Sequence, residues 1–418
     1  MNRIIVLYAA AILALGDPAV SQWSLVSSPT SKHLYDIVFP TRLKGWIVGE
    51  NGALVRTTDG GASWILLPPL DLDQHPGISF ADSLRGWMTG AIGMFYSTTN
   101  GGDAWRQDYL TGLPWTAYFY KVHVAMYATG IRGWAAGGRQ ANLLGTVYTT
   151  TGDGYWSPQV FAFSGRLVGV EALTDSLGWI VGDRGLILKT TNGGRWWNQQ
   201  ESGTETNFNS VKFFDRKEGI VAGDSGKILR TTDGGENWKT TFDTGDEVLF
   251  TIWKHNDSTV YVGGSGATIL ISTDRGKTWE RQVFDAPSNI TIEGIFFTGP
   301  TDGWAVGTDG TILKTVNGGV SAIEGEGKDL PGEFTLAQNY PNPFNPTTVI
   351  SYQLPVASNV RLIIYDLLGR HVAVLVNERK APGSYEVHFD TSGLSSGTYL
   401  YRLSAGGFAQ TRKMVVVK

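Results

Sequence analysis

The chain has 418 residues, enough for two or three domains that each bury a core. Its formal net charge of −4, without any basic run, argues against a surface for nucleic acid, and the absence of cysteine excludes disulfides, thiolate catalysis and cysteine zinc sites. The 54 glycines and 15 tryptophans indicate many short strands joined by tight turns.

The first residues have the composition of a secretory signal peptide. A short positive region containing Arg3 precedes an apolar run at 4–15, and small residues at 19–21 suit signal peptidase. The apolar run is shorter than the roughly 20 residues of a membrane-spanning helix, and no later segment is long and apolar enough to span. We therefore expect a signal peptide at 1–21 and an exported mature protein that begins at Gln22.

The next 300 or so residues repeat with a period of 41. Tryptophans that end a T-T-D/N-G-G-type turn are 41 residues apart from Trp64 to Trp105, and again from Trp197 through Trp238 to Trp279. Each copy also has an alternating apolar segment, a Gly-Trp pair or its equivalent, and a G-x-x-G turn between alternating segments. Four short strands in about 41 residues are typical of one β-propeller blade.

The repeated turn has a physical reason at each position. The Asp or Asn side chain can accept backbone hydrogen bonds, glycine adopts positive φ, and the tryptophan fills the gap between blades. These segments resemble the Asp-box, or BNR, repeat S/T-x-D-x-G-x-x-W, and the whole unit resembles the photosystem II stability/assembly factor-like repeat over residues 22–319. The residues expected to hold these turns are Asp59, Trp64, Asn100, Trp105, Asn192, Trp197, Asp233, Trp238, Asp274, Trp279 and Asn317.

Two copies are irregular: the third reads TTGDGYW up to Trp156, and the last, ending at Ala322, lacks its tryptophan. Trp23 lies 41 residues before Trp64, in register with the series. We therefore expect the mature N-terminus to supply the fourth strand of the last blade and to close a ring of seven. An open or six-bladed ring would leave Trp23 without a role.

After a polar linker at 320–333, residues 334–418 contain short alternating segments that predict a small Ig-like β-sandwich. This tail resembles the type A sorting domain of the type IX secretion system. The resemblance rests on the motifs NYPNPFNP at 339–346, YDxxG at 365–369, SGxY at 396–399 and the terminal KM at 413–414. It implies that the secretion machinery binds residues 334–418 and carries the protein to the outer-membrane surface or outside the cell.

We found no catalytic motif that suits an all-β fold. The six histidines, at 33, 75, 123, 255, 371 and 388, show no metal-ligand spacing, so we expect neither metal nor cofactor. The sequence favours a secreted or cell-surface propeller that binds a protein or glycan as a scaffold, rather than an enzyme. The alternative is a sialidase-like glycoside hydrolase with carboxylates at the channel mouth. Its candidate residues are Asp36, Glu171, Lys212 and Glu293.

Departures from the repeat cluster around the third blade. Six extra residues lie between Trp105 and Trp134, and four more lie between Trp134 and Trp156. We assign the first insertion to the connection between blades and the second to the hairpin of the second and third strands, since both loop types of a four-stranded meander open on the face opposite the Asp-box turns. Insertions gathered on one face of a repeat protein often mark its binding surface. The candidate binding residues there are Tyr109, Trp115, Tyr118, Tyr120, Arg139 and Asn142. Packing of these aromatic rings within the longer loop is the competing interpretation.

Overall fold

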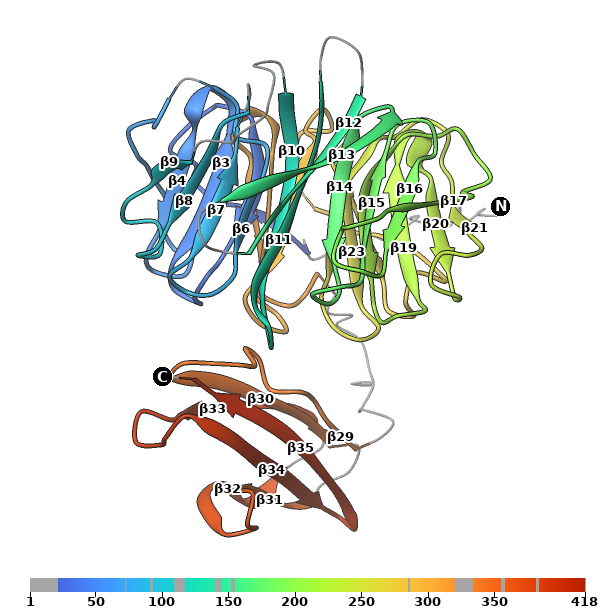
Figure 1. Cartoon of the computed structure of the whole chain (residues 1–418). Coiled ribbons are helices and arrows are strands. Elements are labelled where there is room, and N and C mark those ends of the chain that lie inside the picture. Colours follow the sequence, from blue (N-terminus) through green and yellow to red (C-terminus); the bar gives the residue numbers. More distant parts are fainter. Residues whose placement is uncertain are drawn as a thin grey trace, which may run out of the picture. The chain divides into compact units, whose positions relative to one another are not determined.

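The computed structural model describes residues 22–71, 73–90, 93–108, 117–139, 144–151, 155–284, 286–319, 334–354, 358–380 and 383–417. The chain divides into two compact units, residues 1–322 and 323–418 (Figure 1). In the part that the structure describes, no helix is long and apolar enough to cross a membrane.

The first unit is a ring of seven four-stranded antiparallel sheets around a channel (Figure 1). The first sheet contains β2 (Leu34–Val38), β3 (Gly45–Gly49), β4 (Leu54–Thr57) and β5 (Ile65–Leu66). The second contains β6 (Ile78–Phe80), β7 (Gly86–Thr89), β8 (Phe95–Thr98) and β9 (Arg106–Asp108), and the third β10 (Ala117–Tyr127), β11 (Gly130–Arg139), β12 (Leu144–Thr150) and β13 (Trp156–Ser164). The fourth contains β14 (Leu167–Ala172), β15 (Gly178–Gly182), β16 (Ile187–Thr190) and β17 (Asn198–Gln200).

The fifth sheet contains β18 (Phe208–Phe213), β19 (Gly219–Gly223), β20 (Ile228–Thr231) and β21 (Lys239–Phe242), and the sixth β22 (Leu249–Lys254), β23 (Val260–Gly264), β24 (Thr268–Ser272) and β25 (Glu280–Arg281). The seventh joins β26 (Ile292–Phe297), β27 (Gly303–Gly307) and β28 (Ile312–Thr315) to the N-terminal strand β1 (Ser24–Leu25). Ser24 pairs with Lys314 and Leu25 with Leu313, so the two ends of the propeller share one sheet.

The hydrophobic core lies between neighbouring sheets. One cluster joins Ile37 and Trp64 of the first sheet to Trp304 of the seventh, and similar clusters occur at the other boundaries. Trp23 is 1% exposed and packs edge-on against Phe297. The large apolar residues of the repeat are therefore buried between blades, where the hydrophobic effect stabilises the ring.

The Asp-box turns join the third and fourth strands and lie on one face of the ring, which we call the Asp-box face. In the first turn the Thr57 hydroxyl donates to Asp59 Oδ1 (2.7 Å) and accepts from the Gly61 N–H (2.9 Å), while Asp59 Oδ1 accepts the Ser63 N–H (2.9 Å). The Asp or Asn pairs with a Thr or Ser in the same way at Asn100, Asn192, Asp233, Asp274 and Asn317. These side chains therefore replace missing backbone partners within the turn.

The Asp-box tryptophans reach back to the preceding sheet. Trp105 meets Trp46 edge-on with ring centroids 5.9 Å apart, and Trp197 meets Trp134 at 6.0 Å. Trp238 differs, because it lies edge-on to Phe213 of the same sheet, the fifth. Trp64 and Trp279 are also packed among buried residues of their clusters.

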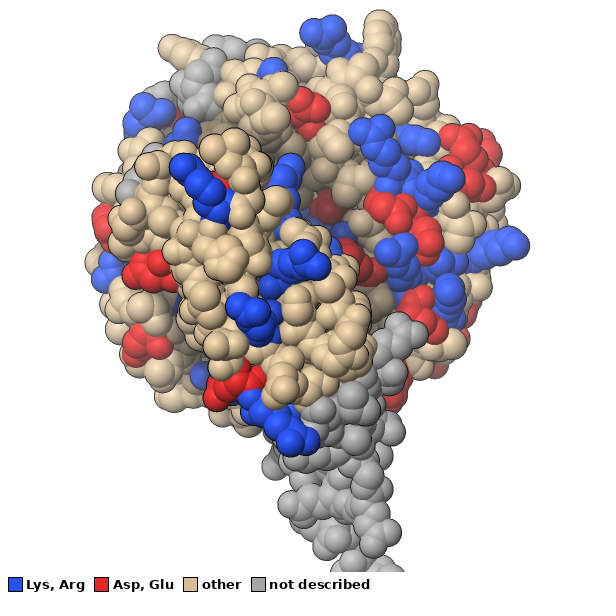
Figure 2. All heavy atoms as spheres, turned by 90° about the horizontal axis from the view of Figure 1, so that it is seen from below, with Lys and Arg blue, Asp and Glu red and all other residues tan. Residues whose placement is uncertain are grey.

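The opposite face carries the G-x-x-G turns between second and third strands. In the first of these turns Gly52 has φ +68, and an added Cβ would lie 2.0 Å from the Asp71 carbonyl oxygen. Only glycine fits there. Figure 2 views the molecule from below, with Lys and Arg side chains interspersed with Asp and Glu side chains on the surface shown.

The second unit is a β-sandwich. One sheet contains β29 (Thr335–Leu336), β30 (Thr347–Leu354) and β33 (Gly383–Asp390). The other contains β31 (Ser358–Tyr365), β32 (His371–Lys380), β34 (Gly397–Ala405) and β35 (Phe408–Val416). Both sheets contribute to one core, which includes Ile350 and Tyr401. Asn339, which opens the proline-rich motif, is buried and donates from its side chain to Thr348 Oγ1 (2.9 Å), so this motif is fixed to the sandwich.

Candidate functional site

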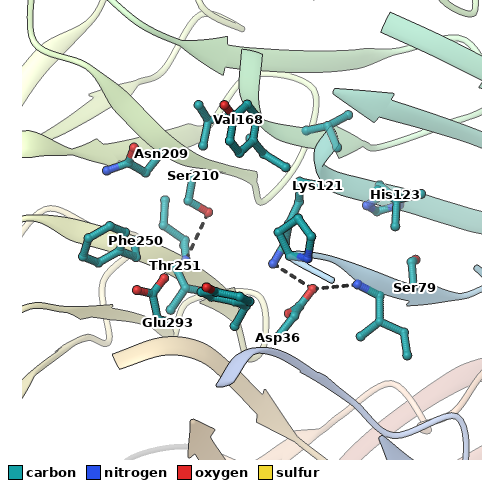
Figure 3. Close-up of a pocket in the computed structure, with 18 of the residues that line it drawn as sticks. Asp36, Ser79, Lys121, His123, Val168, Asn209, Ser210, Phe250, Thr251 and Glu293 are labelled. Carbon is teal, nitrogen blue, oxygen red and sulfur yellow. Dashed lines mark hydrogen bonds and ion pairs between the residues drawn. The ribbon is translucent and has the colours of Figure 1, made fainter. Parts of the chain in front are cut away.

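The first strands of the seven sheets line a central cavity of about 690 Å³. In six of these strands the pairing with the second strand shifts by one residue near its start. Such a β-bulge re-aims a side chain, and here the extra residue of every bulge lines the cavity. These bulged residues are Tyr35, Tyr120, Val168, Asn209, Phe250 and Glu293 (Figure 3).

The bulges lie at the end of the channel next to the G-x-x-G turns, which we call the channel mouth. There the ring of Tyr118 lies 4.8 Å from that of Tyr120, and its hydroxyl donates to Gln74 Oε1 (2.5 Å). The Arg166 guanidinium lies 5.8 Å from the centre of the Tyr120 ring and forms two hydrogen bonds of 3.0 Å with Asp183. The two rings and the cation form a preorganised cluster.

Tyr35 lies beside His33 at the same end, with ring centroids 4.6 Å apart. Burial, reinforced by the charges of Glu50 and Glu293, raises the pKa of Tyr35 to about 12. Burial also raises the pKa of Tyr118. Both phenols are therefore neutral at physiological pH and can donate as well as accept hydrogen bonds.

Deeper in the channel, Asp36 links three blades. Its carboxylate lies 2.9 Å from Lys121 Nζ and accepts the backbone N–H of Ile78 at 3.1 Å (Figure 3). Ser210 makes a similar connection, accepting the Ile252 N–H at 3.1 Å. These contacts hold the inner strands together.

Glu171 and Glu293 also have basic partners in the channel. Glu171 is buried against Lys212, and His123 Nδ1 lies 3.5 Å away. Burial alone would raise the pKa of Glu171, but Lys212 and His123 together lower it to about 2. Glu293 Oε1 lies 3.2 Å from His33 Nε2. The channel thus presents paired charges, which can orient a ligand but leave Glu171 without a proton to donate at neutral pH.

The structure brings some of the predicted binding residues together. Tyr118 and Tyr120 line the cavity, and Arg139 ends β11. Tyr109, Trp115 and Asn142 lie outside the described residues. Asp36, Lys212 and Glu293 of the alternative enzyme site line the cavity, and Glu171 lies beside Lys212.

The prediction that the whole first insertion lies in the loop opposite the Asp-box face was wrong for part of it. The register aligns Val122 with Ile37 and His123 with Val38, because His123 pairs with Trp134 as Val38 pairs with Trp46. From Ile37 to Trp46 there are 9 positions, and from Val122 to Trp134 there are 12. Three of the six extra residues therefore lengthen the β10–β11 hairpin on the Asp-box face, because a hairpin grows at its tip without disturbing the ladder above.

Sequence reasoning missed Tyr35, Arg166, Asn209 and Phe250 at the mouth. Three of them are bulged residues, which occupy one equivalent position two residues before a buried apolar residue of the inner strand, namely Ile37, Val211 or Ile252. Alignment of the repeats at that position shows aromatic and polar residues where a plain strand alternation predicts apolar ones. That signal was present in the sequence.

Two family models match the chain. One, described as photosynthesis system II assembly factor YCF48, matches residues 16–114, 149–244 and 241–316. The other, described as a secretion system C-terminal sorting domain, matches residues 338–418. A curated relative, the photosystem II assembly protein Ycf48 of Thermosynechococcus vestitus, is 40% identical over 53 residues, which are 12% of this chain and 15% of that protein.

Solved structures support the same fold. A structure of YCF48 bound to D1 peptide is similar over 72% of this chain and 99% of its own, with 23% identity and a TM-score of 0.59. YCF48 from Cyanidioschyzon merolae matches over 71% of this chain and 99% of its own, with 22% identity and a TM-score of 0.58. The WD40 propeller domain of Doa1 matches over 70% and 96%, with 10% identity and a TM-score of 0.56.

Proposed function

Because the chain belongs to the family of the photosynthesis system II assembly factor YCF48 and ends in a secretion sorting domain, we propose that it is an exported propeller that binds an extended segment of a partner protein at its channel mouth. The sorting domain indicates export to the outer-membrane surface or the extracellular space by the type IX machinery. The partner is therefore a surface or extracellular protein.

The observation that carries this proposal is the cluster of Tyr118, Tyr120 and Arg166 at the mouth of the 690 Å³ cavity. Tyrosine and arginine are the residues most enriched in binding hot spots, because they supply large contact areas and hydrogen bonds at little entropic cost. Asn207 and Asn209 also line the cavity, and their side-chain NH2 groups donate to Asp224, which fixes their orientation there. A similar structure, YCF48 bound to D1 peptide, favours a protein ligand over a glycan for this propeller.

The paired charges support a binding role over glycoside hydrolysis. A glycosidase needs one carboxyl group that is protonated at the working pH and a second that is free to act as base or nucleophile. Here Glu171 has a pKa of about 2 and lies against Lys212, while Asp36 accepts a backbone N–H and pairs with Lys121. We therefore propose that the protein is not a hydrolase.

The test uses the full chain and a library of random 12-residue peptides. Selected peptides are titrated calorimetrically against the parent and against the double variant Tyr118→Ala with Tyr120→Ala. Removal of two stacked hot-spot rings should weaken binding by about 30-fold or more. Tyr155→Ala is the matched control, because Tyr155 is 73% exposed in the third blade's turn on the Asp-box face.

Tryptophan fluorescence should show that the double variant remains folded. Peptides that bind the double variant as tightly as the parent, or a parent that selects no peptide at all, would refute the proposal.

A further inference from the structure

At two blade boundaries on the Asp-box face, an acid of one blade pairs with a cation of the preceding blade. The position of Arg56 supplies a cation at both boundaries, since Lys189 aligns with Arg56, and Lys44 adds a second cation at the first boundary. At the boundary of the first and second blades, Lys44 Nζ lies 2.7 Å from Asp103 and Arg56 lies 3.5 Å from the same carboxylate. At the boundary of the fourth and fifth, Lys189 lies 3.2 Å from Glu236. Asp103 and Glu236 occupy the same position, directly after the two glycines of the Asp-box turn. A cation on one blade is thus neutralised by an acid on the next.

The boundary of the third and fourth blades breaks this pattern. Arg195 stands at the position of Asp103, and Arg132 stands at the position of Lys44. Among the residues that the structure describes, neither arginine is in an ion pair. Both arginines border a pocket of about 190 Å³, which we call the Arg132–Arg195 pocket. The pocket therefore holds two guanidinium groups at positions where the boundary of the first and second blades has a cation and an anion.

Hydrogen-bonding groups complete the lining of this pocket. The hydroxyls of Thr149, Thr151 and Ser176 and the side chain of Asn192 contribute to its wall. Asp175 also lines it, and its carboxylate accepts the Thr129 hydroxyl at 2.9 Å. The pocket therefore combines two cations and one carboxylate with several neutral polar groups, and its volume suits a single sugar-sized group.

An exposed aromatic ring lies next to Arg195. Trp196 is 68% exposed, whereas Trp197 is buried against Trp134 and carries the structural role of the repeat. The Asp-box turns of the first, second, fifth and sixth blades have Ser63, Ala104, Asn237 and Thr278 at the position of Trp196, and the turn of the third blade has the exposed Tyr155 there. Asn192 Oδ1 accepts the Trp196 N–H at 3.0 Å, so the backbone that carries both side chains is fixed. Exposed aromatic faces beside polar groups are suited to stacking on ligand rings.

The lengthened β10–β11 hairpin meets the same boundary. The Tyr127 hydroxyl donates to the Ala172 carbonyl oxygen at 3.1 Å, and Thr129 bonds to Asp175, so the hairpin tip is attached to the fourth blade. Arg195 in place of an acid, the exposed Trp196 and the longer β10–β11 hairpin thus lie at one blade boundary. Insertions and departures that gather on one part of a repeat protein are typical of a binding site.

We propose that the Arg132–Arg195 pocket binds an acidic sugar, with its carboxylate or sulfate ester between the two guanidinium groups and its ring on Trp196. The site opens on the Asp-box face, because its lining comes from the Asp-box turns of the third and fourth blades and from the residues beside them. It is separate from the channel mouth, so it gives the exported propeller a second ligand, an acidic polysaccharide.

The test titrates the full chain with a galacturonate tetrasaccharide, a sulfated tetrasaccharide, a neutral tetrasaccharide of similar length, and inorganic sulfate. Arg195→Asp is the decisive variant, because it reinstates the acid found in the second blade and gives Arg132 a partner. It should keep the fold and weaken binding of the acidic oligosaccharides by about ten-fold or more. Lys277→Asp makes the same charge change at the equivalent turn position of the sixth blade, on the same face, and should change binding by less than about two-fold.

Trp196→Ala should weaken binding of the tetrasaccharides and leave binding of inorganic sulfate unchanged. Equal binding of acidic and neutral oligosaccharides would overturn the proposal, as would equal losses in Arg195→Asp and Lys277→Asp. Sulfate that binds as tightly as the oligosaccharides would overturn the assignment of a sugar.

Discussion

Trp23→Ala tests whether the N-terminus closes the ring. Trp23 is 1% exposed and packs edge-on against Phe297 and Tyr261, with centroids 5.7 and 6.4 Å away. A tryptophan buries about 150–250 Å², which at about 25 cal/mol per Å² corresponds to about 4–6 kcal/mol. Truncation of a buried aromatic residue costs about 3–5 kcal/mol, so we expect the free energy of unfolding to fall by that amount.

The assay is urea unfolding followed by tryptophan fluorescence. All 15 tryptophans lie between residues 23 and 304, so this signal reports on the propeller and not on the tail. Trp238→Ala should cost about as much, and Trp23→Phe should restore much of the loss because it keeps an aromatic ring in the same place. A change in the unfolding free energy below about 1 kcal/mol for Trp23→Ala would show that the N-terminal strand is not needed to hold the seventh sheet.

Two further predictions concern processing and pH. The form extracted from the cell surface should begin at Gln22 and end near Gly332, and an intact mass that still includes Lys418 would contradict the assigned role of the tail. Burial lowers the pKa of His255 to about 4. An unfolded histidine titrates near 6.5, so stability is retained above that pH and lost by ~3 kcal/mol as pH falls from 6.5 to 4. His255→Gln should remove this part of the pH dependence, and parallel pH profiles for parent and variant would refute it.

Much of the propeller could be predicted because its repeat contains residues whose local backbone conformation and hydrogen bonds allow few alternatives. The glycines of each turn and the Asp or Asn that accepts its backbone N–H groups admit few substitutes, so the period of 41 was visible. The register of Trp23 with Trp64 likewise predicted the N-terminal strand of the seventh sheet, where Ser24 and Leu25 pair with β28.

The binding surfaces were less accessible because they depend on contacts between blades. The alternation of a single inner strand does not reveal a bulge, so the inward placement of Tyr35 and Asn209 needed either the strand register or an alignment of the repeats at that position. The role of Arg195 also became clear only from the structure. Arg195 and Arg132 line one pocket, whereas Lys44, at the position of Arg132, pairs with Asp103. Asp36, by contrast, was predicted as a candidate of the alternative enzyme site, and its carboxylate binds the Ile78 N–H and Lys121 of two other blades.

The most direct test of the proposed function is photo-crosslinking on intact cells. A benzoylphenylalanine introduced in place of Tyr118 probes the channel mouth, and the same group in place of Tyr155 probes the Asp-box face. We predict that the probe at Tyr118 gives covalent adducts on a single extended segment of one surface protein, identified by mass spectrometry. These adducts should disappear when Tyr120→Ala is added. Adducts from Tyr155 alone, or adducts at Tyr118 that persist in the Tyr120→Ala background, would contradict a partner site at the channel mouth.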